Sequence, residues 1–124
     1  MYCSGLQSVS LPNSGLQVIQ SHAFGYCTHL TTINIPASVT LIDAATFRNC
    51  TSLENVTLGN GFSANNLNLS YSTQYTAATI VSWLNALADR TGETAYTLTI
   101  GSANLAKLTA EEIAIATNKN WNLA

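Results

Sequence analysis

Polar and apolar residues alternate with a period of two in three short segments of the first half of the chain. The segments are Ser8-Val9-Ser10-Leu11, Thr32-Ile33-Asn34-Ile35 and Asn55-Val56-Thr57-Leu58. Such alternation is typical of a β-strand with one buried face, because successive side chains point to opposite sides of a strand. We therefore expect three strands whose aliphatic residues point into a core.

The three segments belong to an internal repeat. Cys3, Cys27 and Cys50 recur at a nearly constant interval, and each is followed at matching offsets by leucine, a β-branched residue and a second aliphatic residue. Phe24 and Phe47 each stand three positions before the next cysteine. Repeats of this length bury one continuous core by stacking on their neighbours. The spacing therefore predicts parallel strands one repeat apart.

The second half of the chain departs from this repeat. Proline follows the predicted strand in the first two copies, but Gly59 takes its place in the third, and no cysteine follows Cys50. Alternation at residues 67–70 predicts a further short strand. Because Leu58 and Leu69 are separated by less than half of the repeat interval, we expect the coil between them to be abbreviated or irregular.

A helix and a strand are expected next. Thr76 is a suitable N-cap residue, and the large apolar residues between Ile80 and Leu87 fall on one face of a helix that should end just before Gly92. Residues 96–101 alternate again and predict a strand.

A second helix and a final strand are expected at the end of the chain. Thr109 and Glu112 form a capping box, in which each side chain bonds the other residue's backbone N–H. The helix that they begin should run to about Asn118, with Ile113 and Ala116 facing the core. Residues 121–123 are expected to close the sheet as its last strand.

Length and charge limit what the protein can do. The chain has 124 residues, with 4 basic and 6 acidic side chains. We assign it to a single domain, residues 1–124, with regular repeats over 1–61 and divergent, helix-containing repeats over 62–124. Four basic residues cannot neutralise a run of phosphates, which excludes nucleic acid as a partner. We also expect no membrane insertion and no signal peptide in this chain, because it lacks the apolar segments that both require.

The cysteine-to-phenylalanine spacing, together with the run C-x-x-L-x-x-[VI]-x-[LI]-P, resembles the BspA-like leucine-rich repeat family of bacterial surface proteins. The resemblance covers residues 3–58 with specific motifs and residues 67–124 in general form. It implies an α/β fold, a right-handed leucine-rich-repeat solenoid with a single parallel β-sheet and irregular or helical return segments. It also implies that the cysteines are small buried residues stacked along the solenoid, namely Cys3, Cys27 and Cys50.

The same resemblance implies a function. It indicates a non-catalytic binding or adhesion module at the cell surface, or outside the cell, as part of a parent protein. The alternative is a structural spacer, or a terminal cap of a longer repeat array, with no ligand of its own. Fold alone does not separate these functions.

Alternation along the strands also predicts which residues face solvent. They carry hydroxyl and amide groups and no charge, so they could form a hydrogen-bonding surface for a protein or glycan ligand. A soluble β-face rich in threonine, without a ligand, is the alternative. The predicted face consists of Ser8, Ser10, Thr32, Asn34, Asn55, Thr57, Asn68, Thr97 and Thr99.

No catalytic, cofactor or metal site is predicted. His22 and His29 lie near cysteines in the sequence, but nucleophilic catalysis also needs a group that orients the imidazole, and no carboxylate recurs beside a histidine. Four acids of the second half lie near expected helix ends and match a calcium-binding loop poorly. These acids are Asp89, Glu93, Glu111 and Glu112.

The first repeat has no preceding cap in this sequence. A solenoid needs a polar unit over each end of its core, so we expect Leu6, Val9 and Leu11 to lie at an open edge. An open strand edge pairs readily with another chain. The sequence therefore predicts either self-association through this end or a longer array of which this chain is a part.

Overall fold

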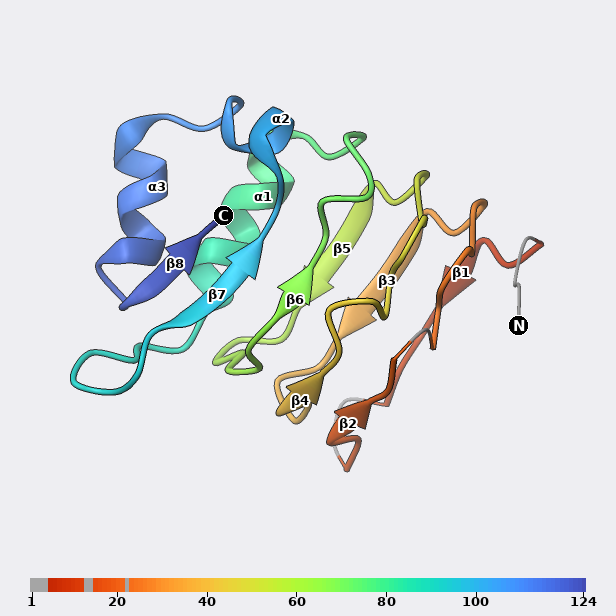
Figure 1. Ribbon diagram of the computed structural model, residues 1–124, viewed down its shortest axis with the longest axis horizontal. Coiled ribbons are helices and arrows are strands. Elements are labelled where there is room, and N and C mark those ends of the chain that lie inside the picture. The colour runs from red at the N-terminus through yellow and green to blue at the C-terminus, as the bar shows by residue number, and fades with distance from the viewer. Residues whose placement is uncertain (1–4, 13–14, 22) are drawn as a thin grey trace.

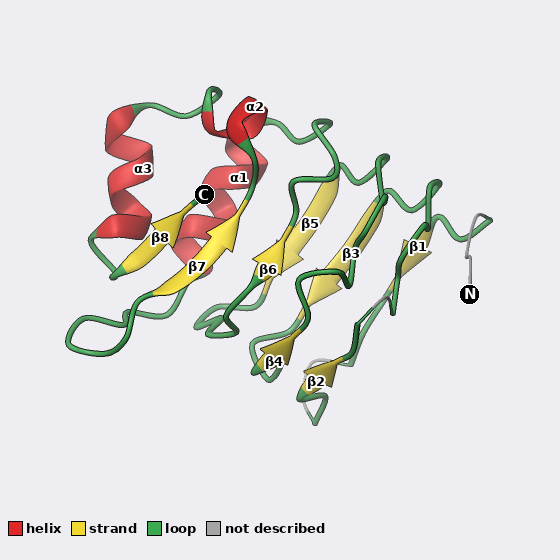
Figure 2. Ribbon diagram, viewed as in Figure 1, coloured by secondary structure: helices red, strands yellow, loops and turns green. Residues whose placement is uncertain are grey.

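The computed structural model describes residues 5–12, 15–21 and 23–124. The predictions made for Cys3 and His22 fall outside these residues. In chain order the elements are β1 (Ser8–Val9), β2 (Val18–Ile19), β3 (Thr32–Ile35), β4 (Leu41–Ile42), β5 (Asn55–Leu58), β6 (Leu67–Asn68), α1 (Ala77–Ala86), β7 (Tyr96–Thr99), α2 (Ser102–Leu105), α3 (Ala110–Thr117) and β8 (Trp121–Leu123) (Figures 1 and 2).

The strands form two parallel series, which we call the first row (β1, β3, β5) and the second row (β2, β4, β6, β7, β8) (Figure 1). Within the second row, β2 pairs with β4 and β6–β7–β8 form a separate sheet. An isolated parallel bridge from Leu41 to Asn65 links the two. The prediction of a single sheet is therefore wrong, because each of the first repeats contributes two short strands rather than one.

Strand register follows the repeat. Ser8 pairs with Thr32 and Thr32 with Asn55, so equivalent residues of consecutive repeats lie side by side, as predicted. The rings of Phe24 and Phe47 stack with centroids 5.6 Å apart and planes 8° from parallel. Cys27 and Cys50 are both fully buried in the same core, which confirms the burial expected of these residues. The Cys50 thiol also donates to the Phe24 carbonyl of the preceding repeat at 2.8 Å.

The coil between β5 and β6 belongs to a repeat of full length. Val18 and its strand partner Leu41 are separated by one repeat, the same number of residues as Cys27 and Cys50. The next bridge, from Leu41 to Asn65, spans one repeat again. Leu58 ends a first-row strand, whereas Leu69 follows a second-row strand. The expected abbreviated coil is therefore wrong, because the short segment after Leu58 connects two rows within one repeat.

Helices replace strands in the first row after β5. Helix α1 packs against β5, and α3 packs against α1 and β8. The Thr76 hydroxyl accepts a hydrogen bond from the Thr79 N–H, as predicted for an N-cap. Helix α1 ends at Ala86, well before Gly92, because Leu87 is extended and forms a parallel bridge with Phe62. The predicted helix end near Gly92 is wrong for that reason.

The last helix and strand agree with their predictions. Thr109 and Glu112 make both bonds of the capping box at the start of α3, and Asn118 is its C-cap. Strand β8 pairs in parallel with β7. Ile113 is only half-buried, whereas Ala116 is fully buried. The single turn of α2 was not predicted.

Gly59 takes the place of proline because another backbone lies against it. A Cβ atom at this position would overlap the backbone nitrogen of Ala37 in the preceding repeat. The Gly59 N–H also donates to the Ile35 carbonyl at 2.8 Å, a bond that proline could not make. Glycine thus lets two neighbouring turns of the chain approach closely.

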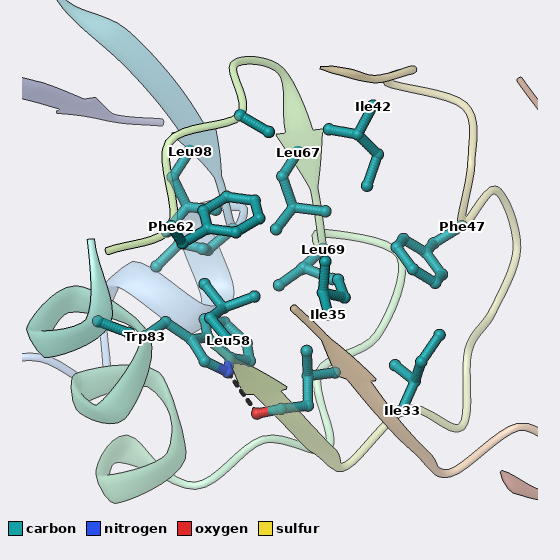
Figure 3. Close-up of a cluster of buried hydrophobic side chains, with 14 of the residues drawn as sticks. Ile33, Ile35, Ile42, Phe47, Leu58, Phe62, Leu67, Leu69, Trp83 and Leu98 are labelled. Carbon is teal, nitrogen blue, oxygen red and sulfur yellow. Dashed lines mark hydrogen bonds between the residues drawn. The ribbon is translucent and has the colours of Figure 1, made fainter. Parts of the chain in front are cut away.

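One apolar core runs through the described repeats and the helices. It includes Ile33 and Phe47 of the second repeat, Phe62 and Leu67 of the third, and Trp83 of α1 (Figure 3). The Trp83 indole N–H donates to the Val56 carbonyl of β5 at 2.7 Å. At this edge of β5 the neighbouring element is a helix, so a side chain supplies the donor that a strand would otherwise provide.

Candidate functional site

The polar residues of the first row form a ladder. Ser8, Thr32 and Asn55 occupy equivalent positions on β1, β3 and β5, and all three are exposed. Thr57, also exposed, lies two positions along β5, and Ser10 is exposed just beyond β1. These five residues, which we call the polar ladder, carry only hydroxyl and amide groups. Neighbouring strands lie about 4.8 Å apart, so the ladder presents hydrogen-bonding groups at a regular spacing.

Asn34 belongs to the same row but serves the fold. Its Oδ1 atom accepts from the Leu11 N–H at 3.0 Å, and its Nδ2 atom donates to the Leu11 carbonyl at 3.2 Å. The β1–β3 pairing ends at Val9 and Ile33, so this amide continues the pairing beyond the strand. Asn34 is therefore a bridge between two repeats, and its amide is not free for a ligand.

The other three residues of the predicted face lie elsewhere. Asn68, Thr97 and Thr99 belong to the second row, where all three are half-buried. The Asn68 Oδ1 atom accepts bonds from the N–H and the hydroxyl of Ser70, at 3.0 and 2.5 Å. The prediction of one continuous face is wrong for these residues, because β6 and β7 extend the row of β4 rather than that of β5.

A groove of about 470 Å³ lies over the second row. Its apolar lining consists of Val18, Ile19, Leu41, Ile42 and Ala44. Of these, Val18 and Leu41 are register partners and are 45% and 63% exposed. They are the exposed large hydrophobic residues of the described part of the chain. Polar residues surround them, namely Gln20, Ser21, Asp43 and Asn66.

Sequence reasoning missed this groove, although a signal was present. Val18-Ile19 and Leu41-Ile42 place two aliphatic residues side by side at equivalent positions of two repeats. In a strand, adjacent side chains point to opposite faces. Since Ile19 and Ile42 are buried, the preceding residue of each pair has to face solvent.

Three of the four cationic side chains are engaged within the fold. Lys119 donates through its Nζ atom to three carbonyls at the end of α1, at 2.9–3.0 Å. Lys107 donates to the carbonyls of Thr73 and Tyr75 at 2.8 and 2.7 Å. The Arg90 guanidinium carbon lies 3.4 Å from the centroid of the Tyr96 ring. The lysine bonds join separate turns of the helical end, whereas Arg90 is held within its own loop. All three charges therefore have little freedom to meet a ligand.

Three of the four acids singled out in the second half of the chain have structural partners of the kind expected at helix ends and turns. Glu112 completes the capping box of α3, and Glu93 forms an ion pair with Arg90 at 3.0 Å. Hydrogen bonds from the hydroxyl and the N–H of Thr91 lower the pKa of Asp89 below its usual value. Among the residues that the structure describes, no group of three or more His, Cys, Asp or Glu side chains could hold a metal ion.

One titratable group in the core is strongly affected by its surroundings. Burial raises the pKa of Tyr75 well above its usual value, and the phenol donates to the Leu69 carbonyl at 3.1 Å. Its ring also contacts Trp83 edge to face, with centroids 4.7 Å apart. Tyr75 therefore stays neutral and joins α1 to the second row.

Within residues 5–12, 15–21 and 23–124, no helix has the length and apolar character needed to cross a bilayer. The longest of the described helices, α1, has 10 residues, whereas a membrane-spanning helix needs about 20.

The family comparison extends the repeat beyond the first half of the chain. A family model described as a BspA type leucine rich repeat region, of six copies, matches residues 1–95. This match includes β6 and α1 as well as the regular repeats. The comparison with curated proteins found no match, and neither did the comparison with solved structures. With three quarters of its length matched and its strands paired in the register of the repeat, the chain belongs to the BspA-type leucine-rich repeat family.

Proposed function

We propose that this chain is a non-catalytic binding or adhesion module of a bacterial cell-surface protein, built as a leucine-rich-repeat solenoid. Its ligand, a protein or a glycan, lies on the polar ladder of Ser8, Ser10, Thr32, Asn55 and Thr57. One observation carries this proposal: the residues are exposed, uncharged and repeated in register on adjacent strands. Hydroxyl and amide groups both donate and accept hydrogen bonds, which suits a ligand with the same chemistry.

The geometry favours an extended ligand that crosses the strands. Thr32 and Asn55 are paired residues of adjacent strands, so a chain running from β1 to β5 meets a new polar group at each strand. The five ladder residues include no aromatic side chain, and hydrogen bonds rather than ring stacking would therefore hold a sugar.

A combined variant tests the proposal. Thr32→Ala, Asn55→Ala and Thr57→Ala together should reduce binding at least tenfold to ligands identified on a printed glycan array or an array of immobilised proteins. The reason is that each lost hydrogen bond contributes about 0.5–1.5 kcal/mol. Asn122→Ala, which changes an exposed amide on β8, is the control. Unchanged binding by the triple variant would refute the ladder as the ligand surface.

A terminal cap of a longer array is the second proposal. Most core residues of the first repeat are only half-buried, Ile19 being the exception, whereas their equivalents one repeat later are buried. For example, Val9 and Phe24 are half-buried, but Ile33 and Phe47 are 1% and 0% exposed. At the other end, α1 and α3 cover the core. This asymmetry supports further repeats stacking on β1, with the helical repeats as the closing unit.

The same half-buried edge supports self-association of the isolated chain. We expect light scattering to show a concentration-dependent dimer, and Val9→Lys to weaken it by at least about tenfold, because a charge on an edge strand opposes pairing. Ser82→Lys adds the same charge to the exposed face of α1 and should leave the dimer intact. A wild-type chain that is monomeric at every concentration would contradict this proposal.

A further inference from the structure

The groove over the second row brings together exposed apolar side chains and a carboxylate. Its lining includes the exposed pair of Val18 and Leu41, and Asp43 is the one charged residue among the described residues of that lining. The polar ladder lies on β1, β3 and β5, whereas the groove lies on β2, β4 and the turn at Asn66. The groove is thus a separate surface from the one proposed above.

We propose that this groove binds a segment of a partner protein in which an aliphatic side chain stands next to lysine or arginine. The aliphatic side chain covers Val18 and Leu41, which removes apolar surface from water. The basic side chain pairs with the Asp43 carboxylate. This inference is independent of the proposed function of the polar ladder.

Charge complementarity selects the basic neighbour. The Asp43 Oδ1 atom accepts from the Ala45 N–H at 2.8 Å, and this turn fixes the carboxylate beside the groove. Its second oxygen can accept from a cation. None of the described residues that line the groove is basic, so an incoming lysine or arginine meets attraction without a competing positive charge from them.

The amide groups at the rim favour a polypeptide over other apolar ligands. Gln20 and Asn66 line the groove at its two sides, in the first and the third repeat. Amide side chains donate and accept hydrogen bonds, so they can pair with the N–H and C=O groups of an extended backbone. A lipid chain offers no such groups. Large apolar residues exposed together within a polar rim are typical of protein interaction sites.

The test is a nuclear magnetic resonance titration of the methyl groups of Val18 and Leu41. The probes are three capped tetrapeptides, Ser-Lys-Leu-Ser, Ser-Glu-Leu-Ser and Ser-Lys-Ser-Ser. We expect the first to shift both methyl signals with millimolar affinity, the glutamate peptide to bind about two- to fivefold more weakly, and the serine peptide about tenfold more weakly. Added salt should remove the preference for lysine over glutamate.

Two variants locate the binding. Leu41→Thr keeps a residue suited to the strand and should weaken the Ser-Lys-Leu-Ser peptide about tenfold. Asp43→Asn keeps an oxygen that can accept from the Ala45 N–H and should abolish the lysine preference. The triple variant of the polar ladder should bind the peptide unchanged. Absence of methyl shifts up to about 10 mM peptide, or equal affinity for the lysine and glutamate peptides, would overturn the inference.

Discussion

Replacing Trp83 with alanine is expected to lower the free energy of unfolding by about 3–5 kcal/mol. The indole is fully buried and contacts Tyr75 edge to face. Its N–H satisfies the Val56 carbonyl at the edge of β5 (Figure 3). Alanine would remove the packing of α1 on the first row and the hydrogen bond together. Since small domains are stable by about 5–15 kcal/mol in total, this loss is a large fraction of the whole.

A second substitution separates the two contributions. Trp83→Phe retains an aromatic ring but has no N–H, so the buried Val56 carbonyl loses its donor at a cost of about 1–3 kcal/mol. Urea unfolding followed by circular dichroism measures both variants. Ser82→Ala, on the exposed side of the same helix, should change stability by less than about 0.5 kcal/mol. If Trp83→Phe were as stable as the wild type, the hydrogen bond would have no role in joining helix and sheet.

Replacing Asn104 with alanine is expected to cost about 2–4 kcal/mol. Asn104 is 1% exposed, and its Nδ2 atom donates to the carbonyls of Ser72 and Ile100 at 2.9 and 2.7 Å. Its Oδ1 atom accepts from Lys107 at 3.0 Å. Alanine would leave two buried carbonyls without these donors, at the place where α2 meets the segment before α1.

The change of Asn104 to aspartate tests the contribution of the two hydrogen bonds that its NH₂ group donates. Asn104→Asp keeps the size of the side chain and an oxygen for Lys107, but it replaces the donating NH₂ group with an oxygen that faces two carbonyls. At neutral pH we expect a loss at least as large as that of Asn104→Ala, measured by thermal unfolding. Asn122→Asp makes the same chemical change at an exposed site of β8 and should be nearly neutral. Equal melting temperatures for both aspartate variants would contradict this account.

Features fixed by nearby residues, such as helix caps and the repeat period, were predicted more reliably than the row to which each strand belongs. The capping box at Thr109, the N-cap at Thr76 and the repeat that aligns Phe24 with Phe47 all depend on residues close in sequence or on one strict period. Each is present in the structure. Such features are predictable because their partners are fixed by spacing alone.

The two rows could not be separated by alternation. Residues 67–70 alternate in the same way as Asn55–Leu58, so both segments fit a half-buried strand. Only the distance along the chain from Leu41 to Asn65, which equals one repeat, identifies β6 as a second-row strand. The short strands β2 and β4 were not predicted either, because two residues are too few to show the alternation of polar and apolar side chains.

The polar ladder was partly predictable, and its exceptions have tertiary causes. Asn34 and Thr57 occupy the same position in consecutive repeats, and nothing in the sequence distinguishes their roles. Asn34 bonds Leu11 because β1 is shorter than β3. Thr57 has α1 rather than another strand beyond it, and its side chain stays exposed. The neighbouring element, a short strand for Asn34 and a helix for Thr57, therefore decides the role of each residue.

The engagement of Lys107 and Lys119 has a practical consequence for chemical work on this protein. Both ammonium groups donate to backbone carbonyls of other turns of the chain. An acylating reagent that reaches either amine would therefore also break the hydrogen bonds that join these turns. Surface coupling or crosslinking through these lysines would loosen the helical end while leaving the strand-built end intact. The rate at which each lysine is acylated would therefore report how often that end opens.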